Sequence, residues 1–148
     1  MTAATQIKKL DKQLLIKILR ENLNWSESHL KSFTEDSLNE IYEYILEGYT
    51  LSKIKSSTDG YLVYIRIPTK VQELLNIKYA DYYDIKVNLH KKEVILYKGE
   101  KNRIKVRSDM KVALPYNLVE KNLLKGKDDT MVLVKGDRIV FKSFSYMQ

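Results

Sequence analysis

The sequence predicts an α+β protein in which a small helical unit precedes a β-rich region. Three observations predict this class. Apolar residues recur at helical spacing before Gly48, strand-like alternation replaces this spacing after Gly48, and an apolar run ending in proline occurs twice, at Pro68 and Pro115. We therefore expect a helical module at 1–48, a first β-rich repeat at 49–100 and a second at 101–148.

The helical module is predicted from its apolar spacing and its caps. Residues 6–23 carry apolar side chains three and four positions apart, which is typical of an amphipathic helix. Ser26 is suited to cap a short helix containing His29, Leu30 and Phe33, and Thr34 is suited to cap a longer one. Gly48 is expected to end that last helix.

Each repeat follows the same order of elements. A basic strand (50–55 or 102–107) and a turn lead to an apolar strand that ends at the proline, and helical spacing follows. An aspartate, Asp81 or Asp128, lies 13 residues after each proline. Two β-branched runs then form a hairpin, 83–89 with 94–98 and 131–134 with 139–142, and the second contains the turn Lys135-Gly136-Asp137.

This order resembles the swapped-hairpin regulators and antitoxins of the AbrB/MazE/SpoVT type, present here in tandem. The clearest match is the set Arg66-Ile67-Pro68, Leu75-Asn76-Ile77 and Asp81-Tyr82-Tyr83-Asp84-Ile85. The resemblance implies that the two AbrB-like repeats interleave as an intramolecular pseudo-dimer and bind DNA through cations near the first strand. Gln72-Glu73 and Val119-Glu120 depart from the basic residues expected after the proline.

Composition limits the compartment and the class of protein. The chain has 148 residues and no cysteine, so a disulfide framework and thiol catalysis are excluded. No apolar run approaches the length of a membrane span, and the amphipathic start does not resemble a signal peptide. These observations predict a soluble, cytoplasmic protein with no membrane partner.

The positive charge is concentrated in the repeats. Residues 1–48 carry six Lys/Arg against eight Asp/Glu, whereas residues 49–148 carry twenty against eleven, a net charge of +9. A basic region beside a slightly acidic one suggests that the repeats meet a polyanion. The alternative is a lysine-rich surface that only keeps the protein soluble.

The DNA-binding residues are expected where cations alternate with apolar residues. Arg103, Lys105 and Arg107 alternate with Ile104 and Val106, which would place three cations on one face of a strand. A charged face that protects a sheet edge would show the same pattern. The predicted DNA-binding set is Lys53, Lys55, Arg66, Lys101, Arg103, Lys105, Arg107 and Lys111.

The N-terminal helices are predicted to contact a protein rather than DNA. A helix-turn-helix interpretation is disfavoured because Glu35, Asp36, Glu40, Glu43 and Glu47 make the last helix acidic, which would repel phosphates. Packing on the repeats, self-association as a homodimer and docking of a partner stay open. Trp25, Phe33 and Tyr42 are the candidate interface residues, although aromatic residues of small domains are usually core.

No pattern indicates an enzyme, a cofactor or a metal site. His29 and His90 are the only histidines and have no metal-ligand neighbours at useful spacing. The pairs Asp81/Asp84 and Asp128/Asp129 are better explained as turn residues than as catalytic carboxylates. Phosphate-binding and nucleophile motifs are lacking as well.

Three functions therefore remain for the sequence. The first is a transcriptional regulator that binds double-stranded DNA through a basic β surface. The second is a protein-interaction module, antitoxin-like or inhibitory toward a host protein, that uses the same fold without reading DNA. The third is an assembly protein that binds nucleic acid without sequence preference.

Overall fold

The computed structural model describes residues 10–59, 61–127 and 129–147, and it shows a mixed α and β protein with antiparallel sheets. The chain divides into two compact units. The helical unit ends at Gly48, and the β unit runs from Tyr49 to Met147.

The helical unit contains α1 (Lys12–Leu23), α2 (Glu27–Lys31) and α3 (Glu35–Leu46). Side chains cap all three: Asp11 accepts from Leu14 N at 2.9 Å, Ser26 from His29 N at 3.2 Å, and Thr34 from Ser37 N at 3.1 Å. The two predicted caps, Ser26 and Thr34, are confirmed. The first helix starts later than expected because Asp11 is its cap, and residues 6–9 lie outside the described part.

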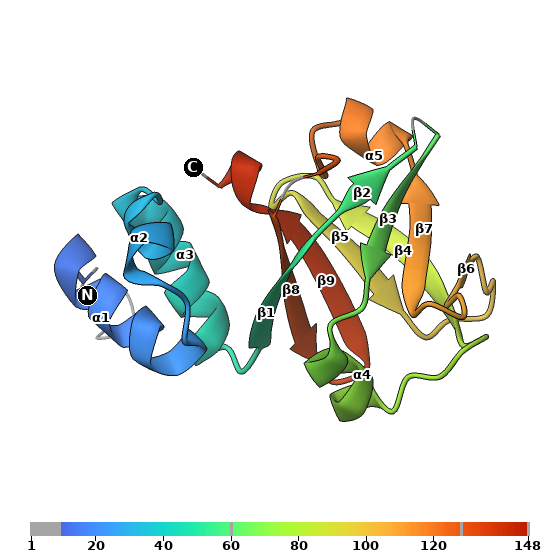
Figure 1. The fold of residues 1–148 in the computed structure, drawn as a ribbon, viewed down its shortest axis with the longest axis horizontal. Coiled ribbons are helices and arrows are strands. Elements are labelled where there is room, and N and C mark those ends of the chain that lie inside the picture. The colour runs from blue at the N-terminus through green and yellow to red at the C-terminus, as the bar shows by residue number, and fades with distance from the viewer. Residues whose placement is uncertain (1–9, 60, 128, 148) are drawn as a thin grey trace, which may run out of the picture. The chain divides into compact units, whose positions relative to one another are not determined.

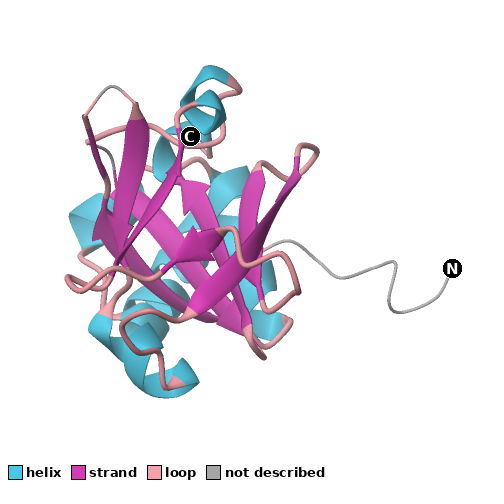
Figure 2. Cartoon of the chain, turned by 90° about the vertical axis from the view of Figure 1, so that its right-hand side faces the viewer, coloured by secondary structure: helices cyan, strands magenta, loops and turns pink. Residues whose placement is uncertain are grey.

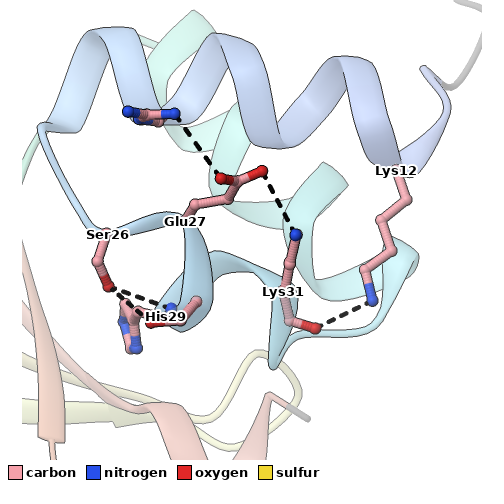
Figure 3. A network of polar contacts seen from close by, with 7 residues as sticks. Lys12, Ser26, Glu27, His29 and Lys31 are labelled. Carbon is pink, nitrogen blue, oxygen red and sulfur yellow. Dashed lines mark hydrogen bonds and ion pairs between the residues drawn. The ribbon is translucent and has the colours of Figure 1, made fainter.

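Polar contacts join α1 to α2 in this unit (Figure 3). Glu27 lies between two cations, with Arg20 at 3.8 Å and Lys31 at 3.5 Å. The ammonium group of Lys12 donates to the backbone oxygen of Lys31 at 3.1 Å. These exposed ion pairs add little free energy individually, so the unit depends mainly on its buried apolar residues.

The β unit contains two antiparallel sheets. The six-stranded sheet has the order β1-β8-β9-β5-β4-β6, and the three-stranded sheet has the order β2-β3-β7. The strands are β1 (Thr50–Lys55), β2 (Ser57–Thr58), β3 (Leu62–Arg66), β4 (Tyr82–Asn88), β5 (Glu93–Tyr97), β6 (Ile104–Lys105), β7 (Lys111–Pro115), β8 (Asp129–Lys135) and β9 (Arg138–Ser143). The helices are α4 (Thr69–Leu75) and α5 (Asn117–Glu120), and the 3-10 turn η2 (Phe144–Tyr146) follows β9.

The core of the β unit lies between the two sheets. Alternate residues of β3 and β7, including Ile65 and Val112, join Leu96 of β5 and Phe141 of β9 in one buried cluster. Figure 1 shows α4 and α5 at opposite ends of β3 and β7, and Figure 2 shows the strands of the two layers crossing one another. Both halves of the β unit therefore fold around one core, and residues 49–100 and 101–147 are not separate bodies.

The strand register relates the two halves in a symmetric way. In the three-stranded sheet Ile65 pairs with Val112, and these residues stand at the same distance before Pro68 and Pro115. In the six-stranded sheet Ile95 pairs with Val140, which occupy matching positions of the two hairpins. The opening strands cross over, because β1 of the first half pairs with β8 and β6 of the second half pairs with β4.

Several expected elements are shorter in the structure. The basic strand predicted at 102–107 is regular only at Ile104–Lys105, and Asn102 at its start has a positive φ of 51°. The helical spacing after Pro115 gives only the single turn of α5, followed by Asn122 with a φ of 58°. The turn expected near Ser56 contains the short strand β2. The predicted aspartate at position 128 lies outside the described residues.

Candidate nucleic-acid interface

The outer face of the three-stranded sheet carries a pair of cations. Ile65 and Val112 point into the core, so the alternate residues Arg66 and Lys111 face outward. The register places Arg66 directly across from Lys111. Like charges in directly opposed positions of a sheet destabilise it, and an anion bound between them would relieve the repulsion.

Two further cations lie in the segment that connects β5 to β7 and contains β6. Ile104 and Val106 are 6% and 0% exposed, so Lys105 and Arg107 project outward. Backbone hydrogen bonds fix the segment on both sides: Val106 N donates to Asp81 O at 2.8 Å, and Arg107 N donates to Lys111 O at 2.9 Å. We call Arg66, Lys105, Arg107 and Lys111 the basic strip.

Arg107 is oriented by an aromatic ring and a carboxylate. Its guanidinium carbon lies 5.2 Å from the centre of the Tyr64 ring, and its Nη2 atom lies 3.8 Å from Asp109 Oδ2. The hydroxyl of Tyr64 in turn donates to Asp59 Oδ2 at 2.8 Å. Arg107 is therefore held over the sheet face rather than extended freely into solvent.

The Asp59 carboxylate stays charged beside this face. Backbone N–H groups of Tyr61 and Leu62 and the Tyr64 hydroxyl donate to it, and they lower the pKa of Asp59 below its usual 3.8. The hydrogen bond from Tyr64 to Asp59 also raises the pKa of Tyr64, so the Tyr64 hydroxyl remains protonated. Asp59 and Asp109 place negative charge next to the basic strip, which limits its positive potential on that side.

The loop before β6 is built around a single carboxylate. Asp84, only 4% exposed, accepts hydrogen bonds from the backbone N–H of Lys101 at 3.0 Å and of Arg103 at 3.4 Å. A Cβ atom at Gly99 would collide with this carboxylate, so the loop needs glycine there. The N–H group of Lys101 makes the largest contribution to lowering the pKa of Asp84. Asp84 thus positions Lys101 and Arg103, both of which are exposed.

The sequence predicts that Asp81 and Asp84 lie in the same turn, and the structure separates them. Asp81 does lie in the turn, where its Oδ2 accepts from Lys78 N at 2.8 Å. Asp84 lies inside β4 and holds the loop at residues 99–103. Its spacing of 17 residues from Lys101 left no local signal for this contact.

Lys53 and Lys55 lie away from the basic strip in the sheet order. They are exposed on β1, at one edge of the six-stranded sheet, while Lys105 is on β6 at the other edge. Lys55 also pairs in register with Asp129, an acidic neighbour. The eight predicted cations therefore form three groups: the basic strip, the loop pair Lys101 and Arg103, and the β1 pair.

Two exposed tyrosines that the predicted site does not include lie near the strip. Tyr79 and Tyr82 are 61% and 41% exposed. Tyr82 is the register partner of Lys105, and the ammonium of Lys105 lies 5.6 Å from the centre of the Tyr79 ring. Exposed aromatic rings beside cations are suited to contact sugars or bases as well as phosphates.

The predicted partner residues of the helical unit are mostly buried. Trp25 is 7% exposed and Phe33 is fully buried, and both rings pack edge-on against His29, at 5.5 and 5.1 Å between ring centres. Tyr42 on α3 is partly exposed. Of these three side chains, only Tyr42 offers appreciable surface to a protein partner.

Within residues 10–59, 61–127 and 129–147, no cluster of three or more His, Cys, Asp or Glu side chains could hold a metal ion. No helix in this part of the chain is long and apolar enough to cross a membrane. Comparisons with known proteins found no match to the chain among family models, curated proteins or solved structures.

Proposed function

We propose that this protein is a DNA-binding regulator whose basic strip contacts the phosphates of duplex DNA. One observation carries the proposal: the paired strands β3 and β7 and the segment at 104–107, which a backbone hydrogen bond joins to β7, present four cations outward, including the like-charged pair Arg66 and Lys111. Lys101 and Arg103 extend the positive surface from the neighbouring loop. Such a surface matches a polyanion, and the exposed Tyr79 and Tyr82 add stacking contacts.

We also propose that the two halves are swapped-hairpin repeats. The crossing of the opening strands supports this, because β1 and β6 each pair with the hairpin of the other half. The pairing of equivalent residues, Ile65 with Val112 and Ile95 with Val140, supports an approximate twofold relation. A pseudo-dimer of this kind would allow one half to diverge for binding while the other maintains the sheet.

The experiment is a titration of the full chain against a labelled random duplex at several salt concentrations. Replacing Arg103, Lys105 and Arg107 together by Gln should weaken binding by about tenfold or more, if each cation contributes on the order of 0.5–1 kcal/mol. The dependence of affinity on salt should also become shallower, by about one unit of slope for each phosphate that the variant no longer neutralises.

A matched control is the triple replacement of Lys121, Lys125 and Lys127 by Gln. These residues are exposed in the β unit, outside the three predicted groups of cations, and the charge change is the same. The control should retain nearly full affinity. Equal losses in the two triple variants would show a nonspecific charge effect, and unchanged binding by the first variant would remove the proposed site.

A protein-interaction module is the second candidate, favoured by exposed large side chains in the first half. Leu74 is 55% exposed and Tyr79 is 61% exposed. Exposed apolar and aromatic groups are frequent at protein interfaces. Capture of a partner from an extract treated with nuclease, abolished on replacing Leu74 and Tyr79 by Ser, would support this candidate over the DNA-binding one.

A further inference from the structure

A groove on the β unit combines tyrosines and cations that the predicted site does not use. Two adjoining hollows, of about 480 and 570 Å³, share Tyr49 and Arg138 in their lining. Tyr97, Lys86 and Lys135 complete the set that we call the tyrosine groove. Each hollow has the size of a small-molecule site.

The strand register explains why these cations lie together. Lys135 and Arg138 are directly opposed at the tight turn between β8 and β9. Arg138 begins β9, and the pairing of Leu96 with Ile139 places Tyr97 beside it on β5. Lys86 lies on β4 with its ammonium 4.9 Å from the centre of the Tyr97 ring. Lys86 thus lies over the Tyr97 ring, Arg138 lies on the neighbouring strand, and Lys135 lies opposite Arg138.

The charge balance of the groove favours an anion. Its lining includes the cations Lys86, Lys91, Lys98, Lys135 and Arg138 and the acids Glu93 and Asp137. The ammonium of Lys98 is already engaged, since it donates to Tyr82 O at 3.2 Å and lies 4.2 Å from the centre of the Tyr83 ring. Glu93 is only 6% exposed, which leaves Asp137 as the exposed acid of the lining.

The opposed pair Lys135 and Arg138 repeats the arrangement of Arg66 and Lys111. Like charges across a strand pair cost free energy when no anion lies between them. Lys135 also lies with its ammonium 5.5 Å from the centre of the Tyr49 ring, so both tyrosines of the groove are in contact with a cation. A ligand with phosphate groups next to a planar ring would place its phosphates between the opposed cations and its ring against a tyrosine.

We propose that the tyrosine groove binds a nucleotide, with its phosphates at Lys135 and Arg138 and its base against Tyr97. Lys86, now over the Tyr97 ring, would turn toward the phosphates. The nucleotide has two possible sources, a free nucleoside triphosphate or one unit of a single strand. This site does not depend on the basic strip, so it can be present whether or not duplex DNA is the main partner.

The test is calorimetric titration of the full chain with a nucleoside triphosphate, with inorganic triphosphate as the probe lacking a ring, and with a single-stranded octanucleotide. The double variant Lys135→Gln/Arg138→Gln should lose about tenfold or more in affinity for whichever nucleotide source binds. Tyr97→Leu should weaken binding of that source several-fold while leaving inorganic triphosphate unaffected. The control Lys121→Gln/Lys125→Gln, at exposed lysines outside the groove and outside the basic strip, should bind the nucleoside triphosphate like the wild type.

Thermal unfolding of each variant, followed by circular dichroism, establishes that it is folded, and Arg138→Lys should recover part of the lost affinity. Binding of the free nucleotide identifies a small-molecule site, and binding of the octanucleotide alone identifies a strand site. The proposal is overturned if neither binds at millimolar concentration, or if the Lys135/Arg138 variant binds both as the wild type does. Equal affinity for inorganic and nucleoside triphosphate would also overturn it, because the ring would then contribute nothing.

Discussion

The two halves of the β unit place different side chains at equivalent positions. Tyr82 pairs with Lys105 and Asp129 pairs with Lys55, which makes Asp84 of β4 the counterpart of Met131 of β8. Both are buried, at 4% and 0% exposure. The Asp84 carboxylate accepts hydrogen bonds from backbone N–H groups of the loop that follows its hairpin. The second hairpin, which contains Met131, is followed instead by the turn η2. The two halves therefore share the same strand pairing, and the residue type at equivalent positions depends on the segment that packs over them.

The outer faces diverge more than the core. Ile65 and Val112 both point inward and both are fully buried. On the opposite side of the same strands, Arg66 occupies the position equivalent to Ala113, and Lys111 the position equivalent to Tyr64. The core constrains residue type in both halves, while the exposed face of each half is free to carry binding residues.

The largest predicted effect tests whether the halves share one core. Leu96 and Phe141 are counterparts and both are fully buried. Leu96→Ala should cost about 2–5 kcal/mol and Phe141→Ala about 3–5 kcal/mol of unfolding free energy, through lost burial and cavity formation. Urea unfolding combined with amide hydrogen exchange should show strands of both halves losing protection together in either variant. Loss confined to the half that carries the substitution would mean that the halves fold independently.

The second prediction concerns the difference between Asp84 and Met131. Because hydrogen bonds lower the pKa of Asp84 below 3.8, its ionised form stabilises the fold above that pH, and this contribution is lost as the pH falls through the folded-state pKa. The melting temperature of the wild type should therefore fall between about pH 5 and pH 2, and that of Asp84→Asn should fall less steeply. Asp59→Asn is the comparison. Hydrogen bonds also lower the pKa of Asp59, but they lie in another loop. An Asp84→Asn profile parallel to the wild type would contradict the role of the carboxylate in holding the loop.

The third prediction compares equivalent cations of the two opening strands. Lys55 faces Asp129 in the register, whereas Lys105 faces the neutral Tyr82. If the basic strip and the loop pair beside it bind DNA, Arg103→Gln/Lys105→Gln should lower duplex affinity by about tenfold, or about 1.4 kcal/mol. Lys53→Gln/Lys55→Gln should lower it by less than about threefold, since Asp129 already offsets part of that charge. Anisotropy titration at one fixed salt concentration measures both, and the reverse order would move the interface to β1.

The sequence was sufficient to predict features that depend on near neighbours. The caps at Ser26 and Thr34, the strand at 50–55 and the outward alternation of Arg103, Lys105 and Arg107 all follow from local spacing. Features set by distant contacts were not accessible. The loop on Asp84 and the tyrosine groove depend on which strands become neighbours, and the separation of Lys53 and Lys55 from Lys105 depends on the strand order. Trp25 and Phe33 are buried together with leucine and isoleucine side chains such as Leu19, Leu30 and Ile41, because a unit this small needs its large side chains to form a core.

The smallest predicted effect lies in the two hairpin turns, which differ in length. The first hairpin turns through residues 89–92 and the second through Gly136 and Asp137. Each contains one residue in the left-handed region, Lys92 with a φ of 55° and Gly136 with a φ of 61°. Gly136→Ala should cost about 1 kcal/mol, since an added Cβ meets no neighbouring atom but strains the backbone.

Lys92→Gly is the matched change in the longer turn, and it should alter the unfolding free energy by less than about 0.5 kcal/mol. Relief of the backbone strain at Lys92 is offset there by the greater freedom that glycine gives to the unfolded chain. Both values come from urea unfolding of the full chain at neutral pH. If Gly136→Ala were neutral, the tight turn would be able to change type without loss, and the shorter connection would not fix the register of β8 and β9.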